Sequence, residues 1–190
     1  EIPLRLVGSE MCIRDRCNCQ TTKTGITAYK EVTSMRRDVF RECTSLTSIT
    51  IPSMDCCSSS KYEWCVNLTD VVLPDTGEMR HIDYGMFLGC TELENIDIPD
   101  SVYEIFDDAF AGCSSLSSVK IPDGMIYIHD RAFAGCSSLK MITIPEGVTN
   151  IDDEAFKGCS SLTTVRIPKS AELGEDVFRG CDNLKEIIYY

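Results

Sequence analysis

The sequence predicts an α/β solenoid in which one short repeat, copied along the chain, supplies both a strand and a turn or helical segment. The eight residues 109–116 recur unchanged at 132–139, and with one substitution at 155–162. A unit that recurs at a fixed step indicates a repeat architecture and outranks any local pattern. The fold alone does not give the function, because the activity of a solenoid depends on side chains outside the repeating pattern.

Each repeat carries a short alternating apolar pair that ends at a proline. In the sixth copy, Val165 and Ile167 flank one polar residue and Pro168 follows. This alternation predicts a strand with one buried face, and proline ends the strand because it has no N–H group to continue a ladder. Stacked copies would lie about 4.8 Å apart in a parallel sheet.

The segment after each proline predicts a second side of the repeat. Val148, Ile151, Ala155 and Phe156 follow one another at spacings of three, four and one, which favours a helical or turn-like path. A glycine precedes the repeated cysteine in most copies, and we expect it to adopt a positive φ or to allow two backbones to approach closely. The aromatic position, which we expect to be buried, holds Phe40, Tyr62, Phe87, Phe110, Phe133, Phe156 and Phe178.

Twelve cysteines suggest a disulfide framework, but their spacing predicts a ladder of free thiols. Seven of them recur once per repeat, at steps of 22, 25, 23, 23, 23 and 22 residues. Equivalent Cβ atoms in stacked repeats run parallel and do not point at one another, which disfavours a disulfide between neighbours. We expect reduced cysteines that pack as small apolar side chains. They are Cys43, Cys65, Cys90, Cys113, Cys136, Cys159 and Cys181.

Composition excludes several classes of partner. The 190 residues carry a net charge of −12, and an acidic surface repels phosphate backbones and anionic lipids. No apolar run approaches the roughly 18 residues needed to span a bilayer. No signal peptide is visible in the first residues. We therefore expect neither a nucleic acid partner nor membrane insertion.

The repeat pattern divides the chain into two parts. Residues 1–23 do not fit the repeat and are predicted to be a separate N-terminal segment, either disordered or a sequence artefact. Residues 7–16 resemble a translated sequencing adaptor and are left out of the fold prediction. Residues 24–190 are predicted to form one solenoid of about seven repeats. Both ends break the pattern, so we expect the natural protein to extend beyond both.

The pattern Leu-x-x-Val/Ile-x-Ile-Pro, followed by a loop and Ala-Phe-x-Gly-Cys, resembles the BspA-like leucine-rich repeat family. The resemblance covers about residues 24–190. It implies a curved right-handed solenoid with a parallel sheet on the concave side and short turns or helical segments on the convex side. It also implies an extracellular or cell-surface location and a role in adhesion to host matrix or to other cells. It transfers no catalytic or binding residue, because the family's activities depend on surface residues that vary.

No arrangement of a nucleophile with a base stands out, so we expect no enzyme and no cofactor. His81 and His129 occupy the same offset in their repeats and are interpreted as surface residues. A metal pair would require sites two repeats apart to meet, so no metal site is predicted. Ser114 and Ser115 are interpreted as turn residues, because their repetition argues against a unique nucleophile.

The concave face is the candidate binding surface, because its side chains alternate with the buried strand positions. This stripe is mostly polar, acidic in the early copies and more basic in the later ones. Trp64 is a candidate anchor, since tryptophan is enriched at binding hot spots, and the alternative is packing against the neighbouring repeat. The predicted ligand-binding residues are Asp70, Asn95, Asp97, Lys120, Met141, Thr143 and Arg166.

The leading interpretation is a non-enzymatic protein–protein interaction module of a surface or secreted, adhesin-like protein. Its expected partner is another protein or a host matrix component. One alternative is a structural spacer without a ligand of its own. Another is an intracellular leucine-rich repeat scaffold, with which reduced thiols are compatible. The sequence leaves the oligomeric state open.

Overall fold

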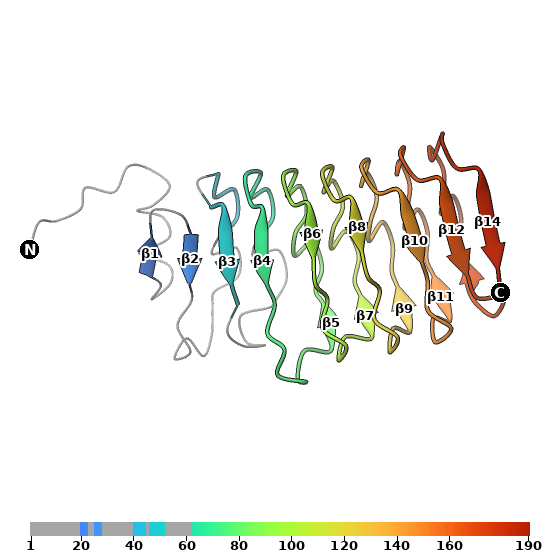
Figure 1. Ribbon diagram of the computed structural model, residues 1–190, viewed down its shortest axis with the longest axis horizontal. Helices are drawn as coiled ribbons and strands as arrows, with labels where there is room; N and C mark the ends of the chain where they lie inside the picture. Colours follow the sequence, from blue (N-terminus) through green and yellow to red (C-terminus); the bar gives the residue numbers. More distant parts are fainter. Residues whose placement is uncertain (1–19, 23–24, 28–39, 45, 52–61) are drawn as a thin grey trace, which may run out of the picture.

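The computed structural model describes residues 20–22, 25–27, 40–44, 46–51 and 62–190. These residues form a parallel β-solenoid in which successive repeats stack side by side along one axis (Figure 1). Residues 1–19 lie outside the described residues, and with them the predictions for the N-terminal segment and for residues 7–16. Among the described residues there is no helix, and hence none that could cross a membrane.

The strands predicted before each proline form one row, the front row, which is the upper row in Figure 1. The partners within this row run parallel, as the sequence predicts. Ile49 pairs with Val71 and Val165 with Ile187, so equivalent positions of successive repeats lie opposite each other. The front row comprises β2 (Gly25–Thr27), β3 (Ser48–Thr50), β4 (Asp70–Val72), β6 (Asn95–Ile96), β8 (Ser118–Val119), β10 (Met141–Thr143), β12 (Thr164–Ile167) and β14 (Glu186–Tyr189).

The first strand of the front row extends the repeat pattern towards the N-terminus. Ile26 pairs with Ile49, which places it in the strand position of a partial repeat. β1 (Gln20–Thr22) pairs antiparallel with β2, so it lies outside the parallel repeat pattern. The predicted boundary at residue 23 therefore falls between these two strands.

Of the turns or helical segments predicted for the opposite side, the described residues show turns and no helix. Two short elements replace a helix in each complete repeat: a strand of two residues and a run of turns. The strands stack into a parallel second sheet, the lower row in Figure 1. The fold is thus a β-solenoid rather than an α/β solenoid. The second sheet comprises β5 (His81–Ile82), β7 (Glu104–Ile105), β9 (Tyr127–Ile128), β11 (Asn150–Ile151) and β13 (Glu172–Leu173).

The run of turns explains the misleading spacing of apolar residues. It contains two residues with positive φ, four positions apart: in one repeat, Asp108 at 56° and Gly112 at 75°. The glycine before the cysteine therefore has the positive φ that the sequence predicts. The first of the two positions is occupied mostly by charged residues and was not predicted. Reversals of backbone hand at both positions prevent an α-helix from continuing, although the apolar residues recur at helix-like intervals.

Alternate amides of this run bind the next repeat. The N–H groups of Asp108, Phe110 and Gly112 donate to carbonyl oxygens of the following repeat at 3.0, 2.8 and 2.7 Å. The N–H groups between them, including that of Ala111, close turns within the same repeat. The turns thus form a third ladder between repeats, beside the two sheets.

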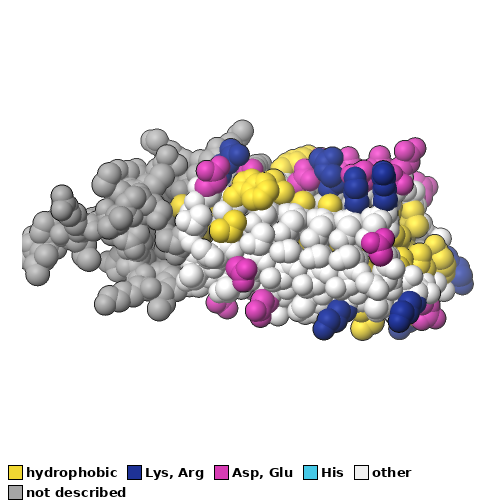
Figure 2. All heavy atoms as spheres, turned by 90° about the horizontal axis from the view of Figure 1, so that it is seen from above, with side chains coloured by type: hydrophobic (Ala, Val, Ile, Leu, Met, Phe, Trp, Pro, Cys, Tyr) yellow, Lys and Arg dark blue, Asp and Glu magenta, His cyan; other side chains and the backbone are white. Residues whose placement is uncertain are grey.

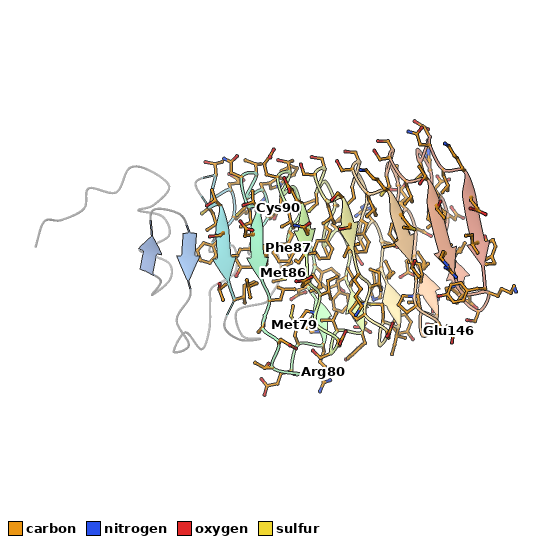
Figure 3. The ribbon with its side chains drawn as sticks, viewed as in Figure 1. Met79, Arg80, Met86, Phe87, Cys90 and Glu146 are labelled. Carbon is orange, nitrogen blue, oxygen red and sulfur yellow. The ribbon has the colours of Figure 1, made fainter. Side chains whose placement is uncertain are left out.

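The core lies between the front row and the second sheet. Phe133 is fully buried, and its ring stacks on Phe110 at 5.2 Å and on Phe156 at 5.3 Å between centroids. The same stacking runs from Phe40 to Phe178. In the third repeat, Met79, Met86, Phe87 and Cys90 fill the interior together (Figure 3).

Phe133→Ala is expected to lower the free energy of unfolding by about 3–5 kcal/mol. The substitution removes a buried ring and leaves a cavity between two rings that are held by their own repeats. Urea denaturation followed by circular dichroism measures the loss. A change below about 1 kcal/mol would contradict the assignment of this position to the core.

Candidate binding surfaces

The seven residues predicted to bind a ligand lie on the outer side of the front row, and all seven are exposed. The strand register sorts them into two lines that run along the axis. The first line holds residues at the start of each strand and the second holds residues two positions later. Met141 pairs with Thr164 in the first line, and Thr143 with Arg166 in the second. The structure thus brings Thr143 and Arg166 together on adjacent strands.

The front row is interrupted at two places. No ladder joins β4 to β6 or β8 to β10 in the part of the chain that the structure describes, although these strands are neighbours. The first interruption lies between strands that are joined by the longest repeat, in which two extra residues precede Phe87. No difference in repeat length accompanies the second. At both places the facing strand edges are left without the ladder bonds found elsewhere in the row.

A hollow of about 750 Å³ adjoins β8 and β10. Three of the predicted residues line it: Lys120, Met141 and Thr143. Met141 is 58% exposed, so its thioether chain is presented to solvent rather than packed into the core. Glu146, labelled in Figure 3, lines the hollow on the side where the strands end. The hollow therefore combines apolar surface with both signs of charge.

Tyr190 forms a wall of this hollow. Its hydroxyl donates a hydrogen bond to the carbonyl oxygen of Ile144, two repeats away. The guanidinium of Arg166 lies over its ring, 5.5 Å from the centroid. Sequence reasoning missed Tyr190, because its position corresponds to the proline of the other repeats. Nothing in the repeat pattern indicates that its side chain reaches Ile144, two repeats away.

A second, smaller hollow of about 280 Å³ lies at the interruption between β4 and β6. Its lining includes the carboxylates of Asp75, Asp97 and Asp100, together with exposed Val72. Lys120 lies 3.6 Å from Asp100, but both side chains are highly exposed, and such a pair contributes little to stability. Asp70 lies on β4 beside this hollow, and Asn95 on β6. The two hollows thus differ in charge.

Trp64 packs against the neighbouring repeat and remains 43% exposed. A Cβ atom placed on Gly89 would lie 2.2 Å from Cε3 of Trp64, so the indole ring covers this glycine. Its Nε1–H donates to Glu63 Oε1 at 2.9 Å. Trp64 also occupies a position with positive φ, at 60°, where the later repeats have glycine. One face of the indole therefore packs on Gly89, as the alternative interpretation predicts. The exposed part of Trp64 stays a candidate anchor for a partner.

Hydroxyl groups on the turns before the front-row strands bind the preceding repeat. Ser114 and Ser137 donate to carbonyl oxygens one repeat back at 3.3 and 3.2 Å, and Thr163 donates at 3.0 Å. Figure 2 views the molecule from the side of these turns and shows a band of uncharged atoms along it, with charged side chains gathered on either side. The serines thus stabilise stacking, which agrees with their interpretation as turn residues.

The seven repeated cysteines are free and buried, as the sequence predicts. Each thiol from Cys65 onward donates to the carbonyl oxygen of the aromatic residue in the preceding repeat; for example, Cys136 Sγ lies 3.3 Å from the oxygen of Phe110. Burial raises the pKa of the Cys136 thiol from 9.0 to about 12. Burial also raises the pKa of Cys65, Cys90 and Cys113, so these thiols are protonated structural groups with little nucleophilic character at neutral pH. The pKa of Cys181 is lowered instead, by its hydrogen bond with Cys159.

The two histidines come close to the same aromatic ring. Phe106 lies between them, with its centroid 5.3 Å from that of His81 and 5.0 Å from that of His129. His129 Nδ1 is 3.0 Å from Asp152 Oδ2. No group of three metal-binding side chains occurs among the described residues. The prediction that the two histidines share one offset is wrong, because the strand register aligns His81 with Glu104 and Tyr127, and Tyr127 lies two positions before His129. Both histidines are only partly exposed, and Nε2 of His129 is buried without a hydrogen-bond partner among the described residues. Sequence reasoning also missed Phe106, which follows the buried Ile105 and lies outside the recurring aromatic position.

The repeat pattern matches a known family model. BspA type Leucine rich repeat region is found in six copies, over residues 12–115 and 56–185. The chain belongs to the BspA-type leucine-rich repeat family. The BspA-type resemblance of the sequence is thereby confirmed. Comparison with curated proteins gives no significant match.

Solved structures of bacterial leucine-rich repeat proteins share the BspA-type fold of this chain. The leucine-rich repeat protein TpLRR of T. pallidum is 26% identical, with a TM-score of 0.67 over 92% of this chain and 79% of that one. A leucine-rich repeat protein from Bacteroides ovatus is 22% identical, with a TM-score of 0.56 over 92% of this chain and 70% of that one. The second likeness supports the fold alone.

Stability is expected to fall as the pH rises above about 9, because the buried thiols cannot ionise in the folded chain. Below pH 9 the thiol of Cys136 is protonated in both states; between 9 and about 12 only the unfolded chain releases the proton. Each such thiol lowers the free energy of unfolding by up to about 1.4 kcal/mol per pH unit in that range. Urea denaturation of the reduced protein at several pH values measures the slope.

Cys136→Ala is the matched control for this slope. It removes one buried thiol, so the slope of the free energy of unfolding against pH should become shallower above pH 9, by the contribution of one proton. An unchanged slope would mean that Cys136 ionises equally in the folded and unfolded chains.

Gly89→Ala is expected to destabilise the fold more than Gly77→Ala. Both glycines have positive φ, at 72° and 73°, so each substitution incurs the left-handed backbone cost of about 1–2 kcal/mol. Only at Gly89 does the new methyl group meet the indole of Trp64, and overpacking adds about 1–3 kcal/mol. Thermal unfolding of both variants tests the difference. In the double variant Trp64→Ala, Gly89→Ala, most of the additional loss of stability should be recovered. If it is not, contact with the indole of Trp64 is not the cause of that loss.

Proposed function

We propose that this chain is a non-enzymatic protein-interaction module that binds an extended segment of a partner protein across its front row. Leucine-rich repeats generally mediate protein binding, and the family membership supports this class of function. The observation that carries the proposal is the hollow between β8 and β10, because three residues predicted to contact a ligand line it. Met141 provides apolar surface there, and Lys120 and Glu146 provide charges at its rim.

An extended peptide suits this geometry. The acidic hollow near Asp97 and the mixed hollow near Lys120 lie in the same row, so one extended segment can contact both. We place the module in a surface or secreted protein with a role in adhesion, and its partner is another protein or a host matrix component.

Replacement of the front-row residues is expected to weaken partner binding at least tenfold. Peptides selected from a random display library, and a panel of purified matrix proteins, are the probes, with affinities measured by surface plasmon resonance. The combined variant Asp70→Ala, Asp97→Ala, Lys120→Ala, Met141→Ser and Arg166→Ala removes the exposed contacts. A tenfold change corresponds to about 1.4 kcal/mol, which a few contact residues at an interface can supply.

A second combined variant keeps the charge balance and leaves the front row intact. Lys140→Ala, Glu175→Ala, Arg179→Ala and Asp182→Ala change four exposed side chains outside the two hollows. Binding should survive in this control. If partners bind both variants as tightly as the original protein, the front row is not the binding surface. If no probe binds the original protein, the spacer interpretation gains support.

A further inference from the structure

Exposed aromatic side chains gather on the outer face of the second sheet, opposite to the core. Tyr84, Tyr103, Ile126 and Tyr127 are four of the exposed large hydrophobic residues of the described chain, with Tyr84 47% and Tyr127 37% exposed. Backbone hydrogen bonds from Ile126 and Tyr127 to the carbonyl oxygen of Tyr103 hold two of the repeats side by side. A contiguous apolar patch on a soluble protein marks an interaction surface.

These rings form one continuous stack that spans three repeats. Tyr84 stacks on Phe106 at 4.6 Å, and Phe106 stacks on His129 at 5.0 Å. Tyr127 lies beside His129 at 5.9 Å. Because stacked neighbours restrict each ring, this face is preorganised and loses little conformational freedom on binding. We call Tyr84, Phe106, Tyr127 and His129, with Tyr103 at their edge, the aromatic face.

Carboxylates surround the aromatic face. Four residues occupy equivalent positions in successive repeats: Asp83, Phe106, His129 and Asp152. The two rings, Phe106 and His129, therefore lie between an acid in the repeat before them and an acid in the repeat after them. Burial and the nearby Asp130 carboxylate raise the pKa of Asp107, next to Phe106 in the sequence. Asp107 follows Phe106 and Asp130 follows His129, so the strand register places these two acids on adjacent repeats next to the line of rings. Arg80, which points away from the core at the lower edge in Figure 3, is the cation nearest in sequence to Tyr84.

The protein's own arginines show which group this chemistry suits. Arg131 forms a two-pronged contact with Asp108, with Nε at 2.9 Å and Nη2 at 2.8 Å from its two oxygens. On the front row, the guanidinium of Arg166 lies over the ring of Tyr190. A planar guanidinium can stack on an aromatic ring and bind a carboxylate at the same time, whereas the ammonium of lysine is a compact point charge.

We infer that the aromatic face binds an arginine-containing basic segment of a partner protein. Its guanidinium groups stack on Tyr84 and Tyr127 and pair with the carboxylates of Asp107 and Asp130. This surface is separate from the front row, so it offers the module a second partner contact, and its occupation does not depend on the function proposed above.

The test uses the full 190-residue chain and two fluorescein-labelled probes, hexa-arginine and hexa-lysine, with binding followed by fluorescence anisotropy at about 0.15 M salt. Hexa-arginine is expected to bind more tightly than hexa-lysine. Tyr127→Ser should weaken hexa-arginine binding about three- to fivefold, from the loss of one cation–π contact. Asp107→Asn should weaken it about two- to fivefold through the loss of one partly exposed charge.

Two controls separate this surface from general attraction to an acidic protein. Asp182→Asn removes the same charge from an exposed turn outside both hollows and should leave hexa-arginine binding nearly unchanged. Asp107→Asn relieves repulsion from Asp130, so it should not unfold the chain, and the melting temperature verifies this. Equal affinities for the two peptides, or equal losses for Asp182→Asn and Asp107→Asn, would overturn the inference in favour of net charge alone. Tight binding of a neutral oligosaccharide that Tyr127→Ser abolishes and Asp107→Asn does not would overturn it in favour of a carbohydrate surface.

Discussion

The hydrogen bonds that alternate amides of each turn make to the next repeat set the register of the whole solenoid. They require the N–H groups of Asp108, Phe110 and Gly112 to point along the axis, and two left-handed residues orient them that way. Once this ladder is formed, equivalent side chains must superimpose. The stacked rings, the thiols and both sheets follow from that superposition. The fold is therefore determined by backbone geometry as much as by the burial of apolar residues.

This constraint explains which features the sequence reveals. A residue type that recurs at a fixed step must occupy the same environment in each repeat, so the buried rings, the strand before each proline and the free cysteines were all predictable. The glycine before each cysteine was predictable because side chains are rarely tolerated at positive φ. The preceding left-handed position was not, since Asp108, Arg131 and Glu154 share no property that indicates it.

The errors also have physical causes. Apolar spacings of three and four occur both in a helix and in a run of turns that contains two residues of left-handed backbone conformation, and periodicity alone does not distinguish them. The strands of the second sheet are only two residues long, which is too short for alternation to appear. The larger hollow was partly predictable: Lys120, Met141 and Thr143 follow from strand alternation. The interruption between β8 and β10 and the wall formed by Tyr190 depend on the distance between neighbouring strands. A repeat pattern does not predict small differences in that distance.

The near-identity of successive repeat interfaces has a consequence for how such a gene changes. Rings at Phe110, Phe133 and Phe156 stack at nearly the same distance, so a turn of the solenoid meets the same neighbour wherever it is inserted. Gain or loss of one repeat can therefore add or delete a whole turn without creating a new interface to optimise. Each event would change the distance between the acidic hollow, the mixed hollow and the aromatic face by one repeat. Spacing between contact points, rather than their chemistry, is then the property that evolution can alter in single steps.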